Sequence, residues 1–117
     1  MFDVIIDKIK ECSASEIADR PHDITKESTV VKIQPQSYDE GVCISRLDVV
    51  CISKAYETAL FSFDRICQGL DELCDEDGEV LDISLSSTVI KYDTVSGMVR
   101  IIGTFDCYTE VMGDGFN

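Results

Sequence analysis

Apolar side chains follow a helical spacing in two segments of the chain and alternate with polar ones in most of the rest. Spacings of three and four residues predict a short helix over residues 2–12 and a longer one from the candidate N-cap Ser53 to about Cys74. β-branched or alternating stretches predict four strands, over residues 29–34, 42–53, 80–92 and 99–111. This order predicts an α+β fold (α-β-β-α-β-β), in which one long helix packs on a four-stranded, mainly antiparallel sheet.

Turn and breaker residues set the expected bounds of these elements. The first strand should stop before Pro35, because proline cannot pair in the middle of a sheet. Gly78 should end the long helix, and residues 93–97 should form a hairpin turn. Residues 13–28 are expected to form a long surface loop that makes contacts, and residues 112–117 a loose, flexible end.

The strand over residues 42–53 is apolar on both faces in its second half. Val49 and Cys51 share one face, whereas Val50 and Ile52 share the other. The first face should pack on the long helix of the same chain, and the second should be buried by something else. The pattern therefore predicts a sheet that needs a neighbour.

Length and composition favour a single domain over residues 1–117. The hydrophobic share is 44% and the mean hydropathy is +0.05, both typical of folded globular proteins. No apolar run approaches the roughly 20 residues that cross a bilayer, so we expect no membrane partner. The first residues lack the basic, apolar and small-residue stretches of a secretory leader, which favours a cytoplasmic location.

Six cysteines occur in the predicted helices and strands, at positions 12, 43, 51, 67, 74 and 107. They fall on core-facing positions, where a reduced cysteine behaves as a small hydrophobic residue. No Cys-x-x-Cys pair occurs, and the one histidine, His22, lies in the predicted surface loop. We therefore expect buried free thiols, no structural metal and no cofactor.

Patterns that would carry catalysis are weak. Nothing in the predicted fold brings His22 to a core cysteine and an acid, so a nucleophile has no base beside it. The acidic run over residues 71–79 lacks the ligand spacing of an EF-hand and indicates a solvated loop. The chain is therefore not expected to be an enzyme.

The formal net charge is −13, from 23 acidic and 10 basic residues. A field of this sign repels phosphate backbones, so tight nucleic-acid binding is not expected. Solubility alone can account for such a charge. Two functional explanations also stay open: a surface that lies close to DNA without adhering to it, and a surface that imitates DNA towards a basic partner.

Three stretches of the chain carry a family resemblance. The first is the short helix over residues 2–12, and the second is a strand, a small cap and an aromatic-acid-x-alanine helix start, LDVVCISKAYETA over residues 47–59. The third is the closing alternating strand, GMVRIIGTFDCY over residues 97–108. In this order they resemble the tail terminator (tail completion) proteins of long-tailed bacteriophages, also called minor capsid or minor tail proteins.

The resemblance covers nearly the full chain and rests on residue types, with two departures. The loop around Pro21 lacks the usual proline and aromatic content, and the six cysteines are not a family feature. A neck protein of the same assembly or a tailocin component therefore stays open as the more specific relative.

The resemblance implies a non-enzymatic structural protein that caps the tail tube, ends its polymerisation and provides the head-tail joining surface. Its implied partners are further copies in a hexameric ring, the tail tube protein and the head connector, with DNA passing through the ring. The implied location is the virion tail, after assembly in the host cytoplasm.

In such a ring, basic and acidic surfaces of different copies should face each other. The expected subunit interface comprises Arg46, Arg100, Asp75, Glu76, Asp77 and Glu79.

The alternative is an acidic, phage-encoded inhibitor that mimics DNA towards a host defence protein. Its acids should form one contiguous outer stripe spaced like phosphates, and it should be a monomer or dimer. The acids here are scattered through predicted helices, loops and strands, which favours the ring.

Overall fold

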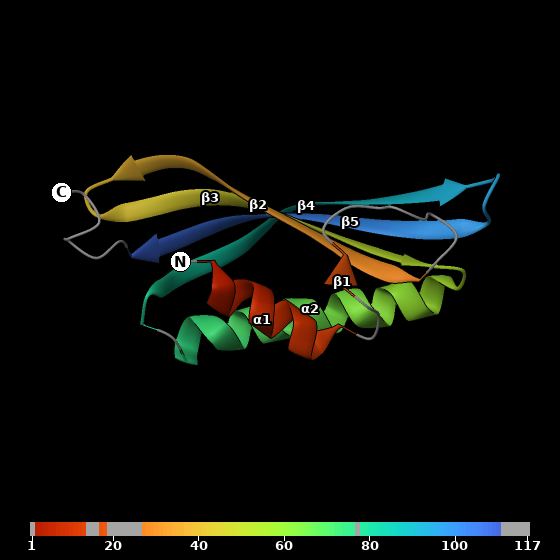
Figure 1. Ribbon diagram of the computed structural model, residues 1–117, viewed down its shortest axis with the longest axis horizontal. Helices are drawn as coiled ribbons and strands as arrows, with labels where there is room; N and C mark the ends of the chain where they lie inside the picture. Colours follow the sequence, from red (N-terminus) through yellow and green to blue (C-terminus); the bar gives the residue numbers. More distant parts are fainter. Residues whose placement is uncertain (1, 14–16, 19–26, 77, 111–117) are drawn as a thin grey trace.

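The computed structural model describes residues 2–13, 17–18, 27–76 and 78–110 of the 117-residue chain (Figure 1). In chain order its elements are α1 (Asp3–Cys12), β1 (Ile17–Ala18), β2 (Ser28–Asp39), β3 (Val42–Ser53), α2 (Tyr56–Glu76), β4 (Val80–Asp93) and β5 (Met98–Glu110).

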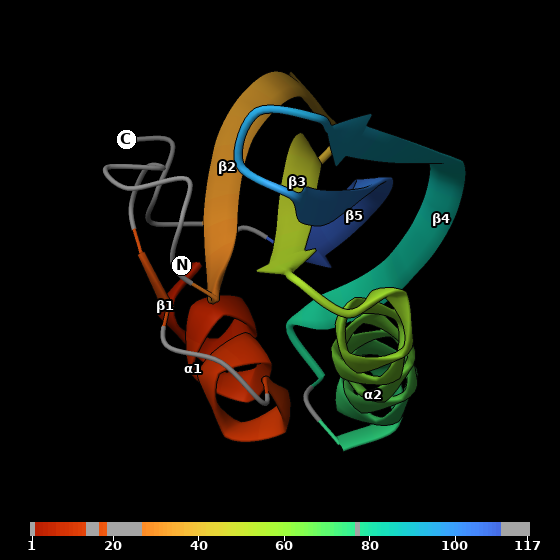
Figure 2. The ribbon, with the colours of Figure 1, turned by 90° about the vertical axis from the view of Figure 1, so that its right-hand side faces the viewer.

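The strands form one sheet in the order β1-β2-β3-β5-β4. Strands β2, β3, β5 and β4 pair antiparallel, and the two-residue β1 adds a parallel edge at Thr29 and Val30. Both helices lie on one side of this sheet, with α1 beneath β2 and α2 beneath β4 and β5 (Figure 2). The predicted α+β order, α-β-β-α-β-β, is confirmed.

One predicted strand end is wrong. Strand β2 continues past Pro35 as far as Asp39, and its register with β3 shifts between Pro35 and Ser37. The register shift accommodates the proline ring. Because β1 pairs with β2 only at Thr29 and Val30, β2 is an edge strand at Pro35, where a missing amide hydrogen is tolerated. The predicted loop over residues 13–28 also contains strand β1. Its residues 14–16 and 19–26, and the predicted end over 112–117, lie outside the described residues.

The main core lies between the sheet and the helices. Strand β3 sends alternate side chains inward, and Leu47 and Val49 are fully buried. Helix α2 meets them with Phe63, Ile66 and Leu70, as its spacing predicts. Helix α1 closes the side of the core with Ile5 and Ile9, both without exposed surface.

Helix α1 packs directly on α2, where Gly69 permits a close approach. A Cβ added at Gly69 would collide with Cys12 Sγ, so a side chain there would push the helices apart. An ion pair also joins the two helices, because Lys8 Nζ of α1 lies 3.5 Å from Glu76 Oε2 of α2. The ion pair is at the surface and contributes little, so packing holds α1 in place.

A second close approach lies at the centre of the sheet. Gly103 of β5 faces α2, and a Cβ added there would overlap the Phe63 ring. Phe63 is 5% exposed and also packs on Phe105, with ring centroids 6.3 Å apart. Glycine at position 103 therefore makes the space that Phe63, the largest buried side chain of α2, fills.

Replacing Gly103 by alanine should lower the free energy of unfolding by about 1 to 3 kcal/mol, because the new methyl group displaces the Phe63 ring. The control is Gly78→Ala, where an added Cβ meets nothing within 4 Å and a change within about 0.5 kcal/mol is expected. Urea melts provide the measurement. Gly103→Ala should also cost less in a Phe63→Leu background, and equal costs in both backgrounds would contradict the contact.

All six cysteines are free thiols, as predicted. Cys43, Cys51 and Cys107 are buried, whereas Cys12 of α1 and both cysteines of α2, Cys67 and Cys74, are half-buried. Burial raises the pKa of Cys51 to about 11 and that of Cys107 to about 12, because the interior disfavours the thiolate. These thiols are therefore unreactive core residues.

The raised thiol pKa values predict loss of stability at high pH. Unfolded thiols ionise near pH 9 while the folded ones stay neutral, so the free energy of unfolding should fall as the pH rises from about 9 towards 11 or 12. Urea melts between pH 8 and 11 measure this slope. Cys107→Ala should reduce it by up to about 1.4 kcal/mol per pH unit, and an unchanged slope would contradict the assignment.

Candidate assembly surface

The face of the sheet that points away from both helices, here called the outer face, is covered by no helix of the described part of the chain (Figure 1). Strand pairing arranges its side chains in rows across the sheet. One row aligns Val50 with Val30 on β2 and with Ile102 on β5. The next row aligns Ile52 with Arg100, which pairs in turn with Lys91 of β4. An apolar row thus lies beside a basic one.

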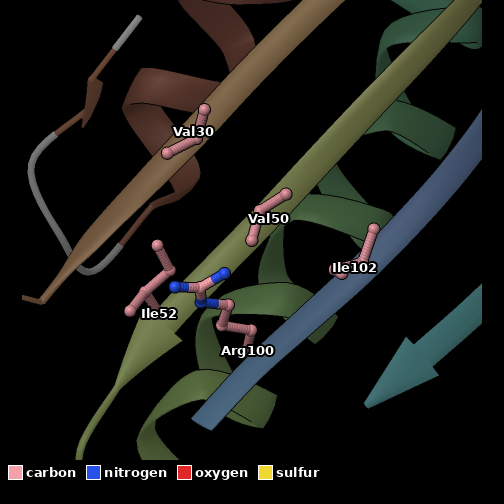
Figure 3. A pocket seen from close by; sticks show the side chains of 5 residues that line it. All are labelled: Val30, Val50, Ile52, Arg100 and Ile102. Atoms are coloured by element: carbon pink, nitrogen blue, oxygen red, sulfur yellow. The ribbon is translucent and has the colours of Figure 1, made fainter. Parts of the chain in front are cut away.

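These two rows enclose a hollow of about 110 Å³. Its lining residues come from β2, β3 and β5 and are Val30, Val50, Ile52, Arg100 and Ile102 (Figure 3). We call this site the Arg100 hollow. Its walls are aliphatic, and the only charged group among the lining residues is the guanidinium.

The Arg100 side chain crosses from β5 towards β3, and its guanidinium lies beside Ile52 (Figure 3). Its Nε is buried and has no hydrogen-bond partner among the described residues. The nearby carboxylate of Asp93 is already engaged, since its Oδ1 accepts hydrogen bonds from the Val95 and Ser96 amides at 2.9 and 3.4 Å. These bonds lower the pKa of Asp93, and Arg100 adds a smaller electrostatic contribution. A buried donor without an acceptor is costly, so the hollow favours an incoming acceptor.

The second half of β3 is predicted to be buried on both faces, and a small second cluster of the same chain provides part of the burial on the outer face. Ile52 is 2% exposed because it packs with Val30 and Met98 on the outer face. Val50 is only half-buried and lines the hollow. The chain therefore buries part of this apolar surface itself and leaves the rest open.

Arg46 lies at the other end of the outer face and has a local partner. Its Nε is 3.2 Å from Asp48 Oδ1, which also accepts a hydrogen bond from Thr104 Oγ1 at 3.1 Å. The Arg46 side chain is 55% exposed, so this ion pair is weak. Of the two predicted interface arginines, Arg46 is the one that forms an ion pair within the described residues.

Two of the four predicted acidic interface residues lie on the layer opposite both arginines, since Asp75 and Glu76 are in the last turn of α2. Glu79 directly precedes β4, and its carbonyl accepts the Glu110 amide at 2.7 Å. Asp77 lies outside the described residues. Contact between these acids and the arginines of a different copy stays a prediction.

The two layers of the molecule differ in charge. Helices α1 and α2 carry nine acidic and three basic residues. The outer face is mixed in charge, because Asp48, Asp82 and Asp106 share it with four of the ten basic residues of the chain. Those bases are Lys32, Arg46, Lys91 and Arg100, of which Lys91 and Arg100 lie opposite each other and form a small basic patch. Glu57, Asp64 and Asp71 repeat every seven residues, two turns apart, and form an exposed acidic stripe along α2.

Strand β4 forms the far edge of the sheet, and among the described residues it pairs only with β5. It exposes large apolar side chains, including Leu85, Ile90 and Tyr92, which are 48%, 53% and 65% exposed. A long apolar edge strand is a surface that another chain can cover. Sequence alternation predicted the strand, but its place at the edge depends on which strands pair.

The described residues contain no group of three or more histidine, cysteine, aspartate or glutamate side chains placed to hold a metal ion. In the same part of the chain, neither helix is long and apolar enough to cross a membrane.

No protein-family model matches the chain, and no curated protein sequence does either. Among solved structures, a chain of the virion of a native gene transfer agent particle has a similar fold, with a TM-score of 0.62, 10% identity and 91% of each chain covered. A crystal structure of a protein from Akkermansia muciniphila aligns at 11% identity over 92% of this chain and 47% of that one, with a TM-score of 0.47. The first similarity extends over both chains and establishes a shared fold.

Proposed function

We propose that the chain is a structural protein of a phage or phage-like virion and has no enzymatic activity. The observation that supports this most is the fold shared end to end with a chain of a gene transfer agent virion, with 91% of each chain covered. Because a shared fold alone carries no function, the proposal joins this match to the tail-terminator resemblance of the sequence, which points to the same class of protein.

Within the virion, we infer that the protein caps the tail tube, ends its polymerisation and provides the surface to which the head joins. The sequence resemblance to tail terminators is the support for this finer role. Neighbouring copies form a ring, six by that resemblance, and contact the tail tube protein and the head connector. The protein is assembled in the host cytoplasm and then resides in the virion tail.

The separation of charge between the two layers suits a ring. A basic patch on the sheet and acidic helices on the opposite layer are different surfaces, so contact between them is head-to-tail. Head-to-tail contacts close into rings when the rotation per subunit allows it. The excess of acids also suits a channel that DNA crosses, because like charges prevent the duplex from adhering.

Because α2 carries an acidic stripe, an inhibitor that mimics DNA is the second candidate function. Its carboxylates recur every two helical turns, or about 11 Å. Phosphates along one DNA strand follow each other every 3.4 Å of helix axis. A stripe about three times sparser than DNA is a poor mimic, which favours the virion role.

Particles that lack the protein should carry tails of variable and excessive length, because nothing stops tube polymerisation. Electron micrographs of particles from a strain without the gene measure this, and supplying the gene in trans should restore uniform tails. Normal tails without the protein would contradict the capping role. Inhibition of a host nuclease by the purified chain would then support the DNA mimic.

The purified protein should not bind duplex DNA at physiological salt, because its net charge of −13 outweighs the basic patch on the sheet. Titration of a fluorescent duplex at about 150 mM salt measures this. Micromolar affinity would contradict both the capping and the mimic hypotheses.

A further inference from the structure

The Arg100 hollow has the properties of a receptor for a side-chain carboxylate next to an apolar group. Its floor is aliphatic, its volume is about 110 Å³, and Arg100 Nε is buried there without a hydrogen-bond partner. Lys91 adjoins Arg100 on the neighbouring strand, so a second cation adds to the positive field. A carboxylate placed here gains charge-assisted hydrogen bonds in a partly dry site.

The acidic stripe of α2 offers the complementary shape and charge. Phe61 is 57% exposed and lies one helical turn from both Glu57 and Asp64. Within the described residues, neither carboxylate forms an ion pair, whereas Glu72 and Glu76 on another side of the helix are paired with Lys8. Arg65 lies over the Phe61 ring, 5.7 Å from its centroid, and holds this aromatic group in place.

The hollow and this helical surface lie at the same end of the molecule but on opposite layers. Ile52 and Arg100 are next to Ser53, the last residue of β3, and α2 begins three residues later. A residue of α2 cannot reach the hollow of its own chain through the sheet. A neighbouring copy presents the same residues from outside.

We propose that the Arg100 hollow binds the first half of α2 from a second copy of this chain. Phe61 of one copy covers the apolar row around Val50 and Ile102, and Asp64 or Glu57 pairs with Arg100 of the next. The two surfaces differ, so the contact is head-to-tail and can continue around a ring. This inference rests on the proposed virion function, since it specifies the contact between the copies of that ring.

Arg100→Gln should weaken self-association at least about tenfold, because the acidic stripe of the neighbour then loses the cation inside the hollow and meets only Lys91 at its edge. Sedimentation equilibrium over a concentration series measures the change, at low and high salt. Lys10→Gln removes the same charge from an exposed position of α1 and should leave the association unchanged. Circular dichroism and a thermal melt verify that both variants are folded.

A charge exchange tests the pairing itself. Arg100→Glu and Asp64→Lys should each weaken the association, and their combination in one chain should restore it. Asp64 is exposed, so Asp64→Lys keeps the fold even if Arg100→Glu does not. Glu57→Lys replaces Asp64→Lys in a parallel series.

The outcomes separate this contact from the virion function. If Arg100→Gln leaves the association unchanged, or if no lysine variant of α2 weakens it, the contact is wrong, while the tail-length experiment still decides the function. A wild-type chain that stays at 13.0 kDa at every concentration and on purified tails also overturns the contact.

Discussion

The antiparallel pairing of β3 with β5, here called the seam, determines where all the other elements of this structure lie. It joins two hairpins that are separated by a 21-residue helix, and it runs for twelve residue pairs, from Val42 with Glu110 to Ser53 with Val99. Closing such a long-range pairing has an entropic cost, which burial beneath the seam must offset. Helix α2 supplies that burial, with Phe63 seated over Gly103 at the centre of β5.

The seam also determines which surfaces stay open. Because α2 crosses back beneath the strands that it connects, both helices lie on one layer, and neither described helix covers the outer face. The hairpin that follows α2 places β4 at the edge, where its apolar side chains are exposed. A single chain of this topology therefore leaves the outer face and the β4 edge as surfaces that neighbours can cover.

Local pattern predicted most of this fold, since alternation and helical spacing report directly which face of an element is buried. It predicted the buried faces of β3 and α2 and the apolar outer side of Val50 and Ile52. It failed at Pro35, because an irregular register and an outer position let a proline stay within a strand. The sequence predicted only part of the Arg100 hollow. Its residues Val30 and Arg100, and the adjoining Lys91, become neighbours only through the order of the strands in the sheet.

We propose that copies of this chain meet sheet to helix within a virion tail. A cryo-electron-microscopy reconstruction of tail ends, from particles of the encoding strain, would show this contact. We expect a ring in which the outer face of each copy covers α2 of the next, with a carboxylate at Arg100. A ring with that face turned to solvent, or a tail end without the protein, would contradict it.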